Sequence, residues 1–123
     1  MSETPRILLV EDDQEQSSLF STCLIMVGYD VVTTRDANTA LERLAESAFA
    51  LVLVDWDLSG MMGDAFITLV RDRYPGVKTV LFSNYANVDD GARASHADAW
   101  MVKNDGILRL REIVSLLLRS SAV

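Results

Sequence analysis

The sequence predicts an α/β fold in which a five-stranded parallel sheet carries helices on both faces. Short apolar, β-branched runs alternate with helical patterns five times along the chain. Several of these runs are continuously hydrophobic, as expected for strands that are buried on both sides. The length of 123 residues is typical of one domain with a single core.

The first elements follow directly from hydrophobic spacing. Residues 7–10 are an uninterrupted apolar run and predict the first strand. Apolar residues recur at helical spacing from Leu19 to Val27, and Gly28 is expected to end that helix. Residues 30–34 predict the second strand.

The middle of the chain adds two helices and a strand between them. Asp36 or Asn38 can cap a helix that runs to about residue 47. Residues 51–54 form the most hydrophobic strand, which we place near the centre of the sheet. Asp64 can cap a third helix through about residue 73, before Pro75.

The last third completes the series. Residues 77–82 predict a fourth strand, and a weak, polar helix is expected between residues 88 and 96. Residues 99–102 predict a fifth strand, and residues 107–119 a final amphipathic helix. Five βα units of this kind predict a doubly wound, flavodoxin-like (βα)5 fold with strand order 2-1-3-4-5. Sites in such folds lie outside the carboxyl ends of the strands.

Charge and composition exclude several classes of partner. The formal net charge is −7 and the sequence pI is about 4.5, so phosphate backbones and anionic lipids would be repelled. We therefore expect no direct nucleic-acid or membrane partner. No apolar stretch is long enough to span a bilayer and the N-terminus lacks a signal pattern, so a cytoplasmic location is expected. Cys23 has no second cysteine to pair with and is predicted to be buried in the core.

Chemically special residues follow four of the five predicted strands. They are Glu11, Asp12 and Asp13; Asp55 and Asp57; Ser83 and Asn84; and Lys103. Each alone is most often a turn residue, a helix cap or a surface lysine, but together they lie on the edge where the fold places its site. Carboxylates this close repel each other unless a cation is present. Ligands that are all oxygen favour Mg²⁺, which also binds phosphate.

The same residues suggest a reaction. With the metal in place, Asp55 can attack phosphorus to form an acyl phosphate. Lys103 can neutralise one phosphoryl oxygen, and Ser83 can hydrogen-bond another.

Four motifs resemble the receiver domain of bacterial two-component response regulators. They are Ile-Leu-Leu-Val-Glu-Asp-Asp at 7–13, Leu-Val-Leu-Val-Asp-Trp-Asp-Leu-Ser-Gly-Met-Met-Gly at 51–63, Val-Leu-Phe-Ser-Asn at 80–84 and Ala-Trp-Met-Val-Lys at 99–103. The resemblance covers essentially the whole chain, which implies a single receiver domain over residues 1–123.

The resemblance implies roles for the acidic residues. Asp55 would accept a phosphoryl group from a sensor histidine kinase or a histidine phosphotransfer protein, and would also bind Mg²⁺. Asp12 would bind the metal directly and Glu11 through water. Asp57 would contribute its backbone carbonyl to the metal. Such a domain is not an enzyme in the usual sense, because it catalyses only its own phosphoryl transfer and slow autodephosphorylation.

The resemblance also implies a switch. Ser83 would move toward the phosphoryl group, Lys103 would pair with that group, and Trp100 would swing inward. The face formed by the weak fourth helix, the fifth strand and the last helix would then contact an output partner or a second copy.

Three departures from the family pattern keep other functions open. Ser59 and Asn104 stand where proline is usual, and Asn84 replaces a commonly small residue. A cis bond before Asn104 would cost about 2.5–4 kcal/mol, so either the loop absorbs strain or the bond is trans. One alternative is a pseudo-receiver, an interaction module that works without phosphorylation. The other is a Mg²⁺-dependent aspartyl-phosphate phosphatase of the haloacid dehalogenase type, although its nucleophile should end the first strand.

Overall fold

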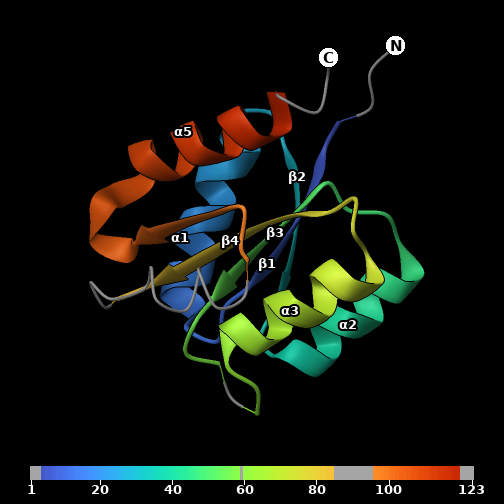
Figure 1. Ribbon diagram of the computed structural model, residues 1–123. Coiled ribbons are helices and arrows are strands. Elements are labelled where there is room, and N and C mark those ends of the chain that lie inside the picture. Colours follow the sequence, from blue (N-terminus) through green and yellow to red (C-terminus); the bar gives the residue numbers. More distant parts are fainter. Residues whose placement is uncertain (1–3, 59, 85–95, 120–123) are drawn as a thin grey trace.

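The computed structural model describes residues 4–58, 60–84 and 96–119 (Figure 1). Its five parallel strands form one sheet in the order β2-β1-β3-β4-β5. The strands are β1 (Arg6–Val10), β2 (Asp30–Thr34), β3 (Leu51–Asp55), β4 (Lys78–Ser83) and β5 (Ala99–Val102). This arrangement confirms the predicted fold and strand order, and each strand ends within one residue of its predicted limits.

The helices form one layer on each face of the sheet. They are α1 (Gln14–Met26), α2 (Ala37–Glu46), α3 (Gly63–Arg73) and α5 (Gly106–Arg119), with a short 3-10 helix, η1 (Lys103–Asp105), before α5. Figure 1 shows α1 and α5 on one face and α2 and α3 on the other. The helix predicted between residues 88 and 96 falls on residues outside the described ranges, apart from residue 96, which lies in a turn.

Each face of the sheet has its own hydrophobic core. Along β1 and β3, Ile7, Leu9, Leu51 and Leu53 pack with α1 and α5, whereas Leu8, Val10, Val52 and Val54 pack with α2 and α3. All eight side chains have no exposed surface. Residues 7–10 and 51–54 are hydrophobic at every position because both faces of the sheet are covered.

Two helices begin with a side-chain cap. Asp13 accepts hydrogen bonds from the backbone N of Glu15 at 2.9 Å and of Gln16 at 3.2 Å. Asp36 accepts from the backbone N of Thr39 at 2.7 Å, so Asp36, rather than Asn38, caps α2. Each cap satisfies backbone donors that the first helical turn leaves unpaired.

The predicted cap of α3 was wrong. Asp64 lies inside the first turn, and Met62 stands at the N-cap position without a side-chain cap hydrogen bond. The backbone N of Gly63 donates instead to the carbonyl of Trp56 at 2.7 Å. The loop after β3 thus supplies the acceptor that a capping side chain would otherwise provide.

The amino edge of the sheet is held by polar side chains. Arg6 and Asp30, at the starts of β1 and β2, form an ion pair at 3.1 Å. Asp98, just before β5, accepts from the backbone N of Thr79 at 2.7 Å and from its Oγ1 at 3.2 Å. Arg71 approaches the other Asp98 oxygen at 3.6 Å.

Two expectations about single features can also be compared with the structure. Cys23 is a buried free cysteine in α1, as predicted. Within the described ranges, no helix has the length and apolar content needed to cross a membrane.

Candidate functional site

The carboxyl edge of the sheet brings the predicted site residues together. Glu11 and Asp12 follow β1, Asp55 ends β3, Ser83 ends β4 and Lys103 follows β5. The strands are parallel, so these ends meet at one edge.

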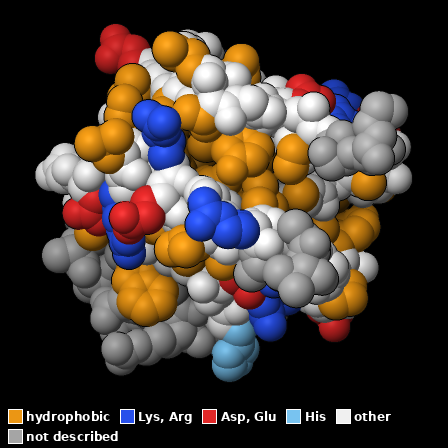
Figure 2. All heavy atoms as spheres, turned by 90° about the horizontal axis from the view of Figure 1, so that it is seen from above, with side chains coloured by type: hydrophobic (Ala, Val, Ile, Leu, Met, Phe, Trp, Pro, Cys, Tyr) orange, Lys and Arg blue, Asp and Glu red, His pale blue; other side chains and the backbone are white. Residues whose placement is uncertain are grey.

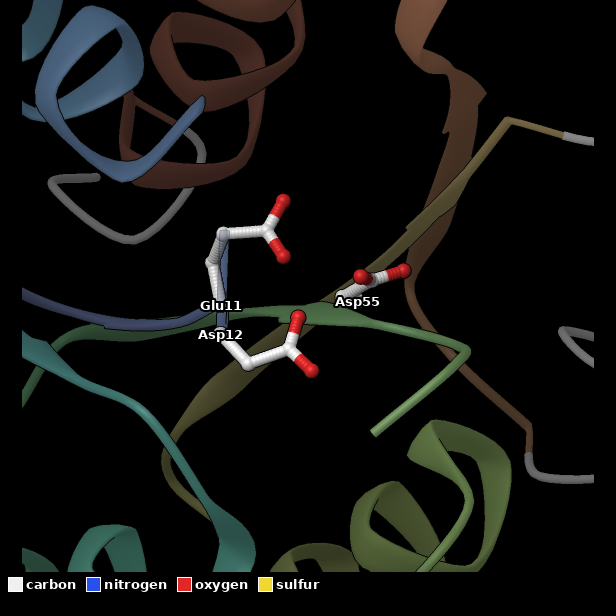
Figure 3. A group of neighbouring side chains, drawn as sticks. All are labelled: Glu11, Asp12 and Asp55. Atoms are coloured by element: carbon white, nitrogen blue, oxygen red, sulfur yellow. The ribbon is translucent and has the colours of Figure 1, made fainter. Parts of the chain in front are cut away.

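Three carboxylates form the centre of this edge. One ligand oxygen from each of Glu11, Asp12 and Asp55 lies within 4.8 Å of the others. In Figure 3 the Glu11 and Asp12 side chains leave the chain after β1 in different directions, and both carboxylates turn toward Asp55 at the end of β3. Glu11 is 1% exposed and Asp55 5% exposed, whereas Asp12 is exposed. The group therefore has a buried floor and one ligand open to solvent.

Lys103 is the cation that Glu11 and Asp55 share. Its ammonium lies 2.6 Å from Glu11 Oε1 and 3.3 Å from Asp55 Oδ2, and all three side chains are buried. It also lies 5.1 Å from the centre of the Phe82 ring, a cation–π distance. The Asp105 carboxylate accepts from the backbone N of Val102 at 3.1 Å and closes the turn that carries Lys103.

Burial and neighbouring charges shift the pKa values of Glu11 and Lys103. Burial raises the pKa of Glu11 to about 7, and the neighbouring Asp55 adds to the rise while Lys103 opposes it. Burial alone would lower the pKa of Lys103, but the hydrogen bond that its ammonium donates to Glu11 and the charge of Asp55 outweigh burial and hold that pKa above its ordinary value. Lys103 is thus a cation at neutral pH. Its single positive charge is too small to balance the three carboxylates of the group when all are ionised.

The donor set fits a small, hard cation. All three candidate ligands are carboxylates. Carboxylate oxygens are the ligands that Mg²⁺ prefers, whereas softer metals favour sulfur or imidazole nitrogen. Octahedral Mg²⁺ places its ligand oxygens about 3 to 4.2 Å apart, so a spread within 4.8 Å needs only small side-chain adjustments. Both Glu11 oxygens already have partners, since Oε2 accepts from the backbone N of Asp13 at 3.3 Å and Oε1 faces Lys103.

Ser83 and Trp100 lie on two adjacent strands, β4 and β5. Ser83 has no exposed surface and is in register with Val102, the residue before Lys103. Trp100 pairs with Leu81 in the sheet, and its side chain is 43% exposed. The structure therefore has Trp100 turned outward.

The structure describes two of the three positions at which the chain departs from the family pattern. The peptide bond between Lys103 and Asn104 is trans, and Lys103 still reaches both carboxylates. Asn84 is exposed at the end of β4. Ser59 lies outside the described residues.

Gly63 is a site residue to which the sequence assigned no role. A Cβ atom at this position would lie 2.3 Å from the Asp55 carbonyl oxygen and 2.7 Å from the Trp56 Cα. Only glycine fits there without displacing the backbone of Asp55. Asp57, whose side chain is exposed, donates its backbone N to Asp55 Oδ1 at 3.2 Å. In the sequence, the signal for the role of Gly63 was its position at the end of the loop, just before a helical pattern.

Comparison with known proteins identifies the family. Residues 7–115 match the family model described as the response regulator receiver domain. The chain belongs to this family. Receiver domains act in two-component signalling, where they interact with kinases and phosphotransfer proteins.

Relatives and solved structures agree with this assignment. The receiver domain is 36% identical over 94 residues to the response regulator protein FleR of Pseudomonas aeruginosa. The matched region covers 76% of this chain and 20% of FleR. It therefore spans about a fifth of that relative.

Two solved receiver structures have the same fold. A CheY-like receiver domain protein from Methanospirillum hungatei has a TM-score of 0.89 and 26% identity, covering 96% of each chain. The response regulator TrrA from Thermotoga maritima, in complex with Mg²⁺-BeF, has a TM-score of 0.86 and 26% identity, covering 93% of this chain and 99% of TrrA.

Proposed function

We propose that this receiver domain accepts a phosphoryl group on Asp55 with the help of Mg²⁺. The observation that carries the proposal is the buried Lys103 ammonium, which lies within 3.3 Å of Asp55 and beside the Glu11 carboxylate. Two buried carboxylates and an exposed third exceed the charge of one lysine. Such a group is suited to a divalent cation and to the charge of a phosphoryl group.

In this proposal each residue has a separate task. An Asp55 carboxylate oxygen attacks phosphorus on a phosphohistidine, the P–O bond forms, and the P–N bond breaks with its electron pair left on the imidazole. The Lys103 ammonium moves from the carboxylates to one phosphoryl oxygen. The Ser83 hydroxyl hydrogen-bonds a second phosphoryl oxygen. Mg²⁺, when bound, would offset the charge of phosphoryl and carboxylate oxygens together.

The proposed metal ligands are Asp12, Asp55 and the Asp57 backbone carbonyl, with Glu11 acting through water. The exposed position of Asp12 supports direct binding. The two existing partners of Glu11 support an indirect role. TrrA, a structural neighbour, was solved in complex with Mg²⁺-BeF, which is consistent with a metal at this edge.

The proposed donor is a sensor histidine kinase or a histidine phosphotransfer protein. The domain would turn over only its own phosphoryl group, by slow hydrolysis. We further propose that phosphorylation draws Ser83 toward the site and Trp100 inward, which would change the surface of β5 and α5. That surface would then contact an output partner or a second copy.

Labelling by a small acyl phosphate tests the acceptor. Acetyl phosphate with Mg²⁺ should add the mass of one phosphoryl group to the wild type, measured by intact-protein mass spectrometry. Asp55→Asn should remove the label and Lys103→Ala should reduce it by about 100-fold or more, the scale of losing one charge-stabilising group. Asp57→Asn, a matched carboxylate two residues away, should keep the label.

Two results would contradict the proposal. Label that persists in Asp55→Asn would place the acceptor elsewhere. A wild type that takes up neither phosphoryl nor beryllofluoride would favour the phosphorylation-independent interaction module. Steady turnover of a phosphate ester would instead favour the phosphatase.

A further inference from the structure

The outer face of α1 carries an unusual lack of charge. Residues 16–29 contain no charged side chain, although 24% of the chain is charged. Within this stretch Leu19 is 51% exposed, Ile25 54% and Met26 79%. The inner face of the same helix buries Phe20 and Leu24. The exposed side of α1 thus combines these three large hydrophobic side chains with the uncharged Ser18 and Thr22, where a helix facing solvent normally carries charged and polar residues.

The helix α2 on the opposite face of the sheet provides the contrast. It buries Ala40 and Leu44, and its exposed positions include Asn38, Glu42 and Glu46. This is the ordinary pattern of a helix that faces solvent. An uncharged outer face with three exposed large hydrophobic side chains is therefore a feature of α1 that α2 does not share.

A groove lies next to this face. It has a volume of about 410 Å³ and runs between the end of α1 and the side of α5. Its lining residues are Val27, Tyr29, Leu108, Arg111, Glu112 and Ser115. Figure 2 looks onto α5 from above and shows hydrophobic side chains exposed around a hollow on this side of the molecule.

The face carries a projecting side chain beside a hollow. Met26, the most exposed of the large hydrophobic side chains in the described residues, adjoins the groove that begins at Val27. A projecting side chain and a hollow on one face can fit the same pair on a second copy, related by a two-fold axis. In that arrangement each Met26 enters the groove of the other copy.

The charges of the groove are also complementary to themselves. Arg111 and Glu112 line it side by side, so a two-fold axis between them brings each arginine to the glutamate of the other copy. Arg111 forms no ion pair with the part of the chain that the structure describes. Glu112 already pairs with Arg109 and can accept a second donor.

We propose that the α1–α5 face, formed by Met26, Val27, Tyr29, Leu108, Arg111, Glu112 and Ser115, binds the same face of a second copy of this chain. This surface shares α5 with the one proposed above to respond to phosphorylation, but it includes the end of α1 in place of β5. Its association needs neither Mg²⁺ nor a phosphoryl group.

The size of the face sets the expected affinity. At 1.5 Å per residue, α1 and α5 are each about 20 Å long, and a helix face is about 10 Å wide. Two such faces bury on the order of 800 Å² per pair, below the range of about 1,200–2,000 Å² for stable complexes. The dimer should therefore be weak and should form only at high protein concentration.

Sedimentation velocity of the 123-residue chain tests the proposal without Mg²⁺ or a phosphoryl donor. Between about 10 μM and about 1 mM, the range of weak complexes, the wild type should shift from monomer toward dimer. Met26→Glu should raise the dimer Kd about tenfold or more, because a charge would enter an apolar groove. Met62→Glu is the matched control: Met62 is 46% exposed beside α3, and this change should leave the Kd unaltered.

Charge reversal tests the pairing directly. Arg111→Glu and Glu112→Arg should each weaken the dimer, and the double variant should restore it, because the pair is re-formed in the opposite sense. Circular dichroism checks that each variant is folded. Three results would overturn the proposal: a wild type that stays monomeric at every concentration, equal weakening by Met62→Glu, or a Met26→Glu variant that dimerises normally and loses only phosphotransfer from a kinase.

Discussion

The two edges of the sheet use polar residues in opposite ways. At the amino edge, Asp98 accepts two hydrogen bonds from Thr79 and faces Arg71, and Arg6 pairs with Asp30. At the carboxyl edge, Glu11 and Asp55 are buried and share the single ammonium of Lys103. The first edge is balanced in charge and holds the strands together. The second keeps a negative excess in a buried place, which costs stability and favours cations.

The largest expected effect comes from removing the shared cation. Lys103→Met should lower the free energy of unfolding by about 3–5 kcal/mol, the usual cost of leaving a buried charge without its partner. Urea denaturation at pH 8 with a chelator measures it. Lys78→Met, the same change at the start of β4, should alter stability by less than about 0.5 kcal/mol. Equal losses of unfolding free energy in Lys103→Met and Lys78→Met would show that the two edges of the sheet do not differ in this way.

The pH dependence of stability sharpens the contrast further. The pKa of Glu11 is about 7 in the folded protein against an ordinary 4.5, so between these values the folded state binds more protons than the unfolded state. Without Mg²⁺, the contribution of Glu11 to stability should therefore fall by about 3 kcal/mol as the pH rises from 4.5 to 7.

Glu11→Gln should flatten the dependence of the unfolding free energy on pH. Glu15→Gln, a change at an exposed position nearby, should leave that dependence unchanged. Added Mg²⁺ should also reduce the slope, because a cation favours the ionised carboxylates. Thermal unfolding as a function of pH gives these values. A wild type and a Glu11→Gln variant with parallel profiles would show that Glu11 does not titrate in this window.

Breaking the amino edge should have a smaller effect and no functional consequence. Asp98→Ala leaves the buried backbone N of Thr79 without its acceptor and should cost about 1–3 kcal/mol. Asp98→Asn keeps an oxygen in place and should cost less. Mg²⁺ affinity should be unchanged in both variants, measured by titration calorimetry. A large loss of Mg²⁺ affinity would mean that the two edges are coupled.

The smallest effect is expected for the ion pair between Arg6 and Asp30. Their side chains are 37% and 55% exposed, and exposed pairs contribute about 0.2–1 kcal/mol. A double-mutant cycle with alanine should give a coupling in that range, and salt should weaken it. Arg6→Ala alone should cost more than the coupling, because Arg6 also lies 4.9 Å from the Phe49 ring centre.

The sequence predicted the strands better than the start of α3. Residues 30–34 and 99–102 were predicted with the limits that the structure has, because hydrophobicity and β-branching act locally. Asp64 was mistaken for a cap because the true acceptor for Gly63 is the carbonyl of Trp56. A contact made by the path of a loop leaves no signal in the residue types.

The sequence predicted which residues meet at this edge, but not which of their side chains would be in contact. The fold rule places Glu11, Asp55 and Lys103 at one edge because parallel strands end together. The sequence paired Lys103 with the phosphoryl group. The structure places its ammonium closer to Glu11, at 2.6 Å, than to Asp55, at 3.3 Å. Such a contact between residues 92 positions apart depends on strand register and on the turn that Asp105 closes.

The two tryptophans give this small domain a pair of built-in optical probes. Trp56 directly follows Asp55 and packs partly buried against the core, whereas Trp100 is 43% exposed on β5. Indole emission shifts to longer wavelength with exposure to water, so the two should emit at different wavelengths. Replacing each in turn by phenylalanine would give one protein that reports on metal and phosphoryl binding and another that reports on the distant surface. The order of those two events could then be timed in a stopped-flow instrument without any added dye.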